Sequence, residues 1–495
     1  MKKLDLNEHF ISRIWENQDY FNNLKTTDGR KIEIINYGKK NVGFAGADYN
    51  NARLKIGDIT FSGDVEIHRT FSDWNLHKHN INGKYNRVIL NIVMWGETDN
   101  VLPKTKYTRE VPTLILSDFL SMSIHKIWKD IINNPSSEFR LPCQKTNQDL
   151  LNEFKEKWIK DMGVTRLNYR ANRLKIRLEE LSNPADLSFS YPKSKQMVLK
   201  TSVNYKKLMW EKVLFEYICE ALGFSKNKKQ FLKLAKNIDF DILKKYKLDL
   251  NQLDAVLFAV AGFLSTRLED KRLEGLNKKS KIIDDVYVEQ LIKSWELIKP
   301  LFNVEIMNYN EWNFFRMRPA NFPMVGIGFA SGLLYSLIYD ELLKKIVLLI
   351  ENSNNITKDI IFMFKNIKCS EYWHKHYCLG IESSYKNYLI GQDKIQSIII
   401  NVICPFILLY SKVYAKAELY DRIIKYYNSE KLKEKNEVVR AMQNQLNYKP
   451  KSASEFQGLI HLHNFYCIKG KCNECRIGEA IFARESTDYL RIILY

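Results

Sequence analysis

The predicted fold of the amino-terminal part depends on residues 52–68, ARLKIGDITFSGDVEIH. Apolar and polar residues alternate over 52–56 and again over 61–67, which is typical of β-strands with one buried face. We therefore expect two neighbouring strands that pair as a hairpin. In the second strand, Val65 and Ile67 should point into the core, while Glu66 and His68 share the opposite face.

The flanking sequence extends this pattern on both sides. Residues 8–23 place apolar side chains at helical spacing, residues 31–38 alternate as a strand, and the apolar run 87–95 suits a strand buried on both faces. Ser72 or Asp73 is a suitable N-cap for a short helix before the last strand. The predicted order is helix, three strands, short helix and strand, which is an α+β domain.

The remainder of the chain has mainly helical patterns after about residue 110, punctuated by prolines and without a regular internal repeat. We expect three parts. The α+β domain covers residues 1–105, a mainly α-helical region that could hold two subdomains covers 106–450, and a cysteine-rich tail covers 451–495.

Composition and charge indicate a globular protein that attracts polyanions. The chain has 495 residues, 45% of them hydrophobic, and a formal net charge of +19. Residues 1–100 carry 14 basic against 13 acidic side chains, which leaves 62 against 44 for the remainder. A nucleic-acid-binding surface should therefore lie mainly beyond residue 100, although A+T-biased coding would also raise the lysine content.

The sequence argues against secretion and against membrane association. The start, MKKLDLNEHF, has acidic residues where a signal peptide needs an apolar core. The apolar run 398–410 is too short to span a bilayer and is interrupted by Asn401 and Pro405, so we expect a buried helix pair or a broken helix there. Eight cysteines in a chain of this length do not form a disulfide scaffold. We expect a cytoplasmic protein in a reducing environment.

Two carboxylates are expected at one end of the predicted hairpin. Asp48 lies just before the first strand and Glu66 lies in the second, so strand pairing would bring their side chains together. Converging carboxylate oxygens favour Mg²⁺ or Mn²⁺, and His68 could hold or deprotonate a water. The alternative is a solvated strand face, on which Glu and His are ordinary.

Two further histidines allow a different site. His77 and His79 are two residues apart and lie on one side only if that stretch is extended. Together with His68 they could form a transition-metal site, while Asp73 would support it. The alternative is hydrogen bonding that fixes a loop, which we expect for at least one of His77 and His79.

The arrangement of these residues resembles the core of PD-(D/E)XK nucleases, in which an Asp precedes Glu-x-Lys on the next strand of a mixed sheet. The matching elements are Asp48 and Glu66-Ile67-His68, with His in place of the usual Lys. The resemblance implies that Asp48, Glu66 and the Ile67 carbonyl hold a divalent ion, and that His68 orients or activates the attacking water. Metal charge would then stabilise the transition state of phosphodiester cleavage.

A second resemblance is carried by segments spread over nearly the whole chain. These segments are residues 63–90, WEKVLFEYICEALGFSKN from 210, LDAVLFAVAGFL at 253–264, RMRPANFP at 316–323, YWHKHY at 372–377, INVICPF at 400–406 and the C-terminal IHLHNFYCIKGKCNEC. Together they are similar to an uncharacterised bacterial family, domain of unknown function 2851. Asn91 stands where the family usually has a His, and Gly326 stands where an Arg is expected. Ala47 and Tyr49 replace the Pro and Phe expected around Asp48.

The RMRPANFP segment holds Arg316 and Arg318 beside two prolines, which fix the backbone. Guanidinium groups held in this way could grip phosphate through paired hydrogen bonds. The alternative is a structural pair of arginines that caps helix ends or pairs with carboxylates.

Three cysteines near the carboxyl end, Cys467, Cys472 and Cys475, are spaced as metal ligands. His463 lies four residues before Cys467 on the same helical face, so the four side chains could bind one Zn²⁺. A [4Fe–4S] cluster with a fourth ligand from elsewhere is the rival. Reduced cysteines without a metal are the third interpretation.

Three functions follow as hypotheses. The leading one is a cytoplasmic, divalent-metal-dependent nuclease with Asp48, Glu66 and His68 in its active site. The second, motivated by His68 at the Lys position, is a non-catalytic nucleic-acid-binding or partner-binding protein on a degenerate nuclease scaffold. The third is a metallohydrolase that acts on a small substrate through its histidines.

Overall fold

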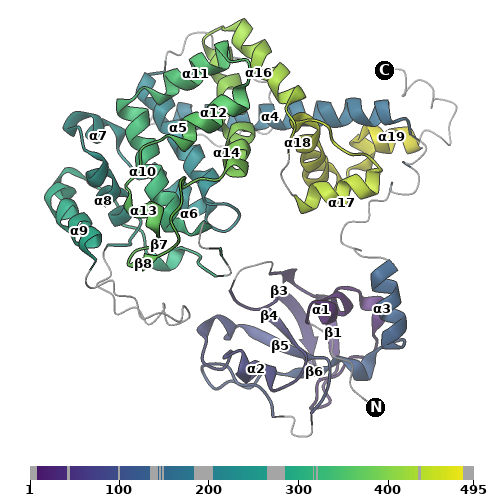
Figure 1. Cartoon of the computed structure of the whole chain (residues 1–495). Helices are drawn as coiled ribbons and strands as arrows, with labels where there is room; N and C mark the ends of the chain where they lie inside the picture. Colours follow the sequence, from purple (N-terminus) through teal and green to yellow (C-terminus); the bar gives the residue numbers. More distant parts are fainter. Residues whose placement is uncertain are drawn as a thin grey trace. The chain divides into compact units, whose positions relative to one another are not determined.

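The computed structural model describes residues 8–41, 45–97, 101–133, 143, 147, 150–182, 205–264, 285–315, 317–318, 321–432 and 436–482. The chain forms two compact units, Met1–Arg140 and Leu141–Tyr495, and each has its own architecture (Figure 1). The first unit contains a mixed β-sheet with short helices, and the second is mainly α-helical. The predicted fold class, an α+β domain followed by a helical region, is confirmed.

The sheet of the first unit consists of β1 (Ile32–Asn36), β2 (Lys39–Lys40), β3 (Tyr49–Ile56), β4 (Ile59–His68), β5 (Val88–Val93) and β6 (Thr113–Ile115). Its strand order is β1-β3-β4-β5-β6, and β2 pairs with β3 beside this path. The β1–β3 and β3–β4 pairs are antiparallel, whereas the β4–β5 and β5–β6 pairs are parallel. The hairpin expected from residues 52–68 is β3 followed by β4.

The helices of the first unit are α1 (Glu8–Glu16), α2 (Asp73–Leu76) and α3 (Ile124–Asn133). The first two lie where the sequence predicts a helix and a short helix. The sheet continues past residue 105, because Leu114 of β6 pairs with Ile92 of β5. Alternation is not detectable in a strand of three residues, so β6 could not be predicted from its pattern.

Burial in the hairpin follows the predicted alternation only in part. The buried apolar residues of β3 are Tyr49, Ala52, Leu54 and Ile56. In β4, however, every residue from 63 to 68 is buried, including Glu66 and His68. The segment after β4 covers this face, and its fully buried Trp74 lies beside His68, with ring centroids 5.9 Å apart. The interpretation of Glu66 and His68 as part of a solvated strand face is therefore wrong.

A β-bulge in β3 explains the buried carboxylate of Asp64. The register between β3 and β4 shifts between Tyr49 and Ala52, and Asn51 within this bulge has a left-handed backbone with φ of 57°. The backbone N–H of Asn51 donates to Oδ1 of Asp64 over 3.0 Å. Asp64 therefore satisfies the bulged backbone of the neighbouring strand.

The α-helices of the second unit are α4 (Asn152–Ser182), α5 (Lys207–Leu222), α6 (Lys228–Lys236), α7 (Phe240–Tyr246), α8 (Leu250–Val260), α9 (Val286–Ile298), α10 (Pro323–Tyr339), α11 (Leu342–Asn352), α12 (Ile356–Lys365), α13 (Tyr372–Lys375), α14 (Gln392–Ile398), α15 (Cys404–Val413), α16 (Ala417–Ser429), α17 (Glu437–Leu446), α18 (Ala453–Leu462) and α19 (Arg476–Phe482). A two-stranded hairpin of β7 (His376–Cys378) and β8 (Ile381–Glu382) lies among them. The long helix α4 contributes residues 167–178 to a large apolar core and residues 158–162 to a smaller core with α17, α18 and α19.

One helix among the described residues, Gln392–Val413, is long and apolar enough to cross a membrane, and most of it is buried inside the second unit. It comprises α14, a π-helical segment from Ile399 to Ile403, and α15. The guanidinium group of Arg170 donates to the carbonyl oxygen of Asn401 over 2.9 Å, which satisfies a backbone acceptor within the π-helical segment. In place of the expected helix pair or broken helix, this segment is one continuous helix that is mostly buried.

Candidate functional site

The polypeptide between β4 and β5 brings three histidines together. His68 ends β4, and His77 and His79 follow α2. The carboxylate of Asp73 accepts hydrogen bonds of 3.1 and 3.2 Å from two backbone N–H groups just after β4, which fixes the turn into α2. Lys78 has a left-handed backbone with φ of 59°. The stretch is therefore not extended, and the turn at Lys78 places the two flanking rings next to His68.

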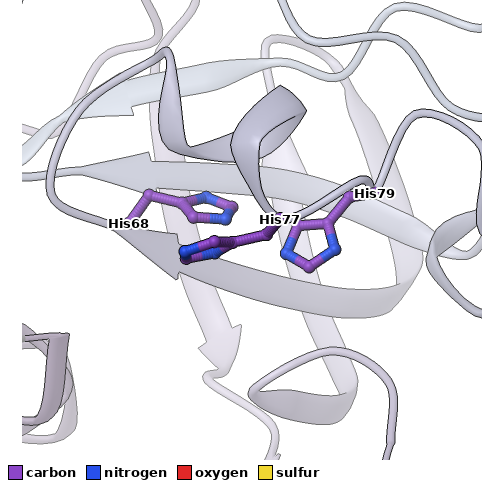
Figure 2. A group of neighbouring side chains, drawn as sticks. All are labelled: His68, His77 and His79. Atoms are coloured by element: carbon purple, nitrogen blue, oxygen red, sulfur yellow. The ribbon is translucent and has the colours of Figure 1, made fainter. Parts of the chain in front are cut away.

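The three imidazole rings lie next to one another (Figure 2), and one nitrogen of each lies within 4.8 Å of those of the other two. The ring centroids are 5.2 to 5.5 Å apart. His68 and His79 are buried, whereas 40% of the His77 side chain is exposed. The cluster is therefore enclosed by protein around two rings and accessible to solvent at the third.

Glu66 brings a carboxylate to the same cluster. Its Oε1 atom lies 3.1 Å from Nε2 of His79 and 3.9 Å from Nε2 of His68. The approach to His79 is close, but its direction does not make a hydrogen bond. Burial raises the pKa of Glu66 well above the usual range, and the neighbouring charge of Asp48 adds to this rise. Glu66 therefore holds a proton to a higher pH than an exposed glutamate does.

The carboxylates of Asp48 and Glu66 each accept a hydrogen bond from a backbone N–H across the β3–β4 hairpin. The backbone N–H of Asp48 donates to Oε2 of Glu66 over 2.9 Å, and the N–H of Ile67 donates to Oδ2 of Asp48 over 3.0 Å. These bonds place both carboxylates at the same end of the strand pair, where their charges interact. Glu66 uses one oxygen for this backbone contact and presents the other to the histidines.

His68 is oriented by Asn91 of the neighbouring strand β5. Nδ1 of His68 lies 2.8 Å from Oδ1 of Asn91. Because an amide oxygen can only accept, His68 carries its proton on Nδ1 and leaves the lone pair of Nε2 for a ligand. This Nε2 atom is buried and has no hydrogen-bond partner among the described residues. Burial lowers the pKa of His68 to about 4.

His79 is held by stacking and not by hydrogen bonds. Its ring stacks on Tyr85 with centroids 3.7 Å apart, and neither ring nitrogen has a hydrogen-bond partner in the described part of the chain. Burial, together with the nearby His68 and His77, lowers the pKa of His79 to about 3. His68 and His79 are therefore neutral at pH 7 and offer lone pairs to a ligand without first losing a proton.

The donor set fits a transition-metal ion better than Mg²⁺. Imidazole nitrogen suits Zn²⁺, Fe and Ni, whereas Mg²⁺ prefers oxygen ligands. Three histidines are an established ligand set of catalytic zinc sites, with metal–nitrogen distances of about 2.0–2.1 Å. Two nitrogens bound to a tetrahedral ion at this distance lie about 3.3–3.4 Å apart, so the observed spread of up to 4.8 Å requires the rings to close by up to about 1.5 Å.

Two residues at the site, Glu8 and Asn91, were not among the predicted site residues. Glu8 of α1 places Oε1 3.9 Å from Nδ1 of His77, and burial raises its pKa. Residue spacing does not show which helix packs against this end of the sheet, so the sequence could not identify Glu8 as a residue of the site. For Asn91, the sequence offered one indication of a role at the site, which was that Asn stands where the resemblance leads us to expect a His.

The remaining predicted site residues belong to the second unit. Arg318 is exposed, and Arg316 lies outside the described residues. His463 is buried, and its Nδ1 lies 3.0 Å from Oδ1 of Asn464. The tail cysteines are Cys467 and Cys472, which are half-buried, and Cys475, which is buried.

Comparison with known families supports the second resemblance seen in the sequence. The family model described as "Protein of unknown function (DUF2851)" matches residues 8–191 and 185–437, which together include the histidine cluster and most of the chain. No curated protein and no solved structure matches the chain. The chain therefore belongs to the DUF2851 family of proteins of unknown function.

Proposed function

We propose that this chain is a metal-dependent hydrolase whose ion is held by His68, His77 and His79. The observation that carries the proposal is the convergence of three imidazole nitrogens within 4.8 Å at the end of β4. Buried polar atoms without partners cost about 1–3 kcal/mol each, and Nε2 of His68 and both ring nitrogens of His79 are such atoms. An ion bound by Nε2 of His68 and by one ring nitrogen of His79 would compensate part of that cost.

The chain's own residues supply proton transfer at the site. A bound ion would lower the pKa of a coordinated water and so provide a nucleophile near neutral pH. Oε1 of Glu66 lies 3.1 Å from Nε2 of His79, and a carboxylate with a raised pKa is a stronger base than an exposed glutamate. The backbone N–H of Asp48 fixes the other oxygen of Glu66. Asn91 accepts from Nδ1 of His68, so Nε2 stays deprotonated and would be available to the ion.

The substrate class that we propose is the phosphodiester bond of nucleic acid. The net charge of +19, with 62 basic against 44 acidic residues beyond residue 100, favours a polyanionic substrate. The strand arrangement, antiparallel from β1 to β4 and then parallel to β5, supports the resemblance to the PD-(D/E)XK core. The imidazole-rich donor set favours Zn²⁺ or Fe²⁺ in place of the usual Mg²⁺.

The test uses the full-length protein, freed of metal by a chelator and reloaded separately with Zn²⁺, Mn²⁺, Fe²⁺ or Mg²⁺. Single- and double-stranded DNA and RNA are the substrates. We expect cleavage with at least one transition metal, its loss in His79→Ala and Glu66→Gln, and its retention in Leu76→Ala. Leu76 is a suitable control because it lies on α2 beside the cluster and is 73% exposed. Cleavage that persists without His79 would disprove the proposed metal centre.

A second candidate is a hydrolase acting on a small ester or phosphodiester. The specific observation in its favour is that imidazoles, and not carboxylates alone, dominate the cluster. This candidate predicts metal-dependent hydrolysis of bis(p-nitrophenyl) phosphate or a p-nitrophenyl ester, with no cleavage of any polynucleotide. Salt-sensitive binding of nucleic acid without cleavage of either kind of substrate would instead support the non-catalytic function.

A further inference from the structure

Four of the eight cysteines gather in the second unit although they come from two distant parts of the sequence. Cys475 is buried in the small apolar core of α4, α17, α18 and α19, and Cys143 and Cys467 pack against the same core. Cys472 is close enough for its thiol to interact with those of Cys143 and Cys467. More than 320 residues therefore separate Cys143 from its neighbours in this cluster, here called the thiol cluster.

The thiols of the cluster influence one another electrostatically. Burial raises the pKa of Cys143 to about 11, and Cys475 and Cys472 add to the rise. Burial also raises the pKa of Cys467, with further contributions from Cys475, Cys143 and Cys472. Each of the four thiols therefore lies within interaction distance of at least two others.

The other four cysteines show that this gathering is not a general property of buried thiols in this chain. They are Cys219, Cys369, Cys378 and Cys404. Where a charged side chain adds to the effect of burial on their pKa values, it is a carboxylate: Glu216 for Cys219, Asp254 for Cys369 and Glu430 for Cys404. None of the eight cysteines, all of which lie in described parts of the chain, forms a disulfide.

The local backbone explains how three of these thiols converge within nine residues. The helix α18 continues into a π-helical segment that ends at Cys467, and π-helical turns recur at functional sites. Gly470 has φ of 64°, which reverses the chain before the 3-10 helix that begins at Cys472. Gly478 of α19 rests on that turn so closely that a Cβ atom there would lie 2.0 Å from the carbonyl oxygen of Cys472.

A side-chain contact ties Cys143 to the same region. The amide group of Asn147 donates to the carbonyl oxygen of Cys143 over 2.7 Å and to that of Gln445 over 2.9 Å. Gln445 belongs to α17, which shares the small core with Cys475. The hydrogen bonds of Asn147 therefore connect Cys143 to α17, which in turn packs with the segment that carries Cys475.

We propose that Cys143, Cys467, Cys472 and Cys475 bind one thiophilic metal centre, either Zn²⁺ or an iron–sulfur cluster, that joins the start of the second unit to its carboxyl-terminal end. Four thiolates are a ligand set of structural zinc sites and of iron–sulfur clusters. Each thiol releases its proton to solvent as its sulfur binds the metal, and no sulfur is oxidised. The fourth ligand is thus Cys143 and not His463, because the thiol of Cys143 interacts with those of Cys467, Cys472 and Cys475.

The sulfur atoms are less tightly assembled than the histidine nitrogens. Among the described residues, the three histidines form a group whose ligand atoms all lie within 4.8 Å of one another, and the four cysteines do not form such a group. Metal binding should therefore draw the four sulfurs together, because zinc–sulfur distances are about 2.3 Å. That movement should raise the resistance of the small core of α4, α17, α18 and α19 to unfolding.

The test measures metal content of the full-length protein in a His77→Ala/His79→Ala background, which removes the proposed hydrolase metal from the count. The protein is purified without chelator, both in air and without oxygen. About one zinc per chain would identify a zinc site, and iron with acid-labile sulfide and visible absorption would identify a cluster. Either result supports the proposal, and the absence of both metals overturns it. The hydrolase proposal is unaffected by this outcome.

Variants then identify the ligands. Cys143→Ser and Cys472→Ser should each lose at least nine tenths of the metal, whereas His463→Gln and the matched control Cys369→Ser should keep it. Full metal content in Cys143→Ser, or its loss in His463→Gln, would overturn the assignment of the fourth ligand.

Should the serine variants fail to fold, thiol alkylation of the native protein supplies the decisive measurement. The four cluster thiols should resist alkylation, as mapped by mass spectrometry, until the metal is removed with a chelator. Equal labelling before and after removal would disprove the site.

Discussion

Nδ1 of His68 on β4 lies 2.8 Å from Oδ1 of Asn91 on the parallel neighbour β5. This contact determines which nitrogen of His68 is available to a metal. Asn91→Leu removes the acceptor and leaves a buried N–H unsatisfied, so the ring can turn or change tautomer. Loss of such a supporting contact typically lowers metal affinity by about 10–100-fold. Competition titration of Zn²⁺ against a chromophoric chelator would measure it.

The matched control for this prediction is Asn75→Leu. Asn75 is exposed on α2 and lies two residues before His77. Its substitution should leave zinc affinity within twofold of the wild-type value. Equal losses in both variants would mean that His68 does not depend on Asn91.

Glu66→Gln should separate proton transfer from metal binding. The amide retains an acceptor for the backbone N–H of Asp48 but cannot take up a proton. We expect the turnover number to fall by about 10²–10⁴-fold, the range associated with general base catalysis. Metal content should stay unchanged, because the three histidines hold the ion. Parallel measurements of kcat and of bound metal would check this, and joint loss of both would make Glu66 a ligand.

The same substitution predicts a stability change in the metal-free protein. The pKa of Glu66 is raised in the folded state, so the folded protein binds more protons than the unfolded chain above the ordinary glutamate pKa. Its stability therefore falls as pH rises through this range. Glu66→Gln removes that dependence. The free energy of unfolding of the metal-free variant, measured relative to the metal-free wild type, should therefore be higher at pH 8 than at pH 4.

The fold could be predicted to the extent that it depends on local periodicity. Alternation over residues 52–67 identified β3 and β4, and the continuous apolar run identified β5. Burial of the polar face of β4 could not be predicted, because Trp74 covers it from α2, whose position depends on the hydrogen bonds that Asp73 accepts from the backbone after β4. A half-solvated strand and a fully covered one have the same alternation.

The candidate site was predictable in its residue types but not in its assembly. His68, His77 and His79 were recognised as possible ligands, but the spacing of His77 and His79 required an extended chain to place them together. A left-handed Lys78 achieves the same result, and such a conformation is rare enough for lysine that no pattern predicts it. The proximity of Cys143 to the tail cysteines could not be predicted for a related reason, since contacts between distant segments leave no periodic signal in the sequence.

Asp254 should make the stability of the second unit depend on pH. It is fully buried on α8, its Oδ2 accepts from the hydroxyl of Tyr287 over 2.6 Å, and burial raises its pKa to about 7. The unfolded chain releases this proton near pH 3.8. The folded state therefore binds more protons between about pH 4 and 7, and stability falls as pH rises through this window. A rise of about three pKa units corresponds to roughly 4 kcal/mol at high pH.

Asp254→Asn removes the ionisable group and should stabilise the protein at pH 8 relative to the wild type, with a smaller or reversed difference at pH 4. Urea unfolding at both pH values would measure it. The matched control, Asp393→Asn, changes an exposed aspartate on α14 and should show the same small difference at both pH values. A difference for Asp254→Asn that does not change with pH would contradict the ionisation argument.

The helices α4 and α18 cross at backbone contact through two glycines. A Cβ atom on Gly458 would lie 1.9 Å from the carbonyl oxygen of Ile159, and one on Gly163 would lie 2.1 Å from that of Ser454. Both obstructing atoms belong to the backbone and cannot rotate away. Gly458→Ala must therefore push the helices apart, although alanine is the better helix former.

We expect Gly458→Ala to lower the free energy of unfolding by about 1–3 kcal/mol or more, the range for overpacking of a tight interface. Denaturant unfolding followed by circular dichroism would measure it. Gly391→Ala is the matched control, because a Cβ atom there meets nothing within 4 Å and the backbone φ of −75° suits alanine. An unchanged midpoint in Gly458→Ala would mean that the two helices do not pack at backbone distance. In that case the small core beside the thiol cluster would also need a different packing, since α18 leads directly into Cys467.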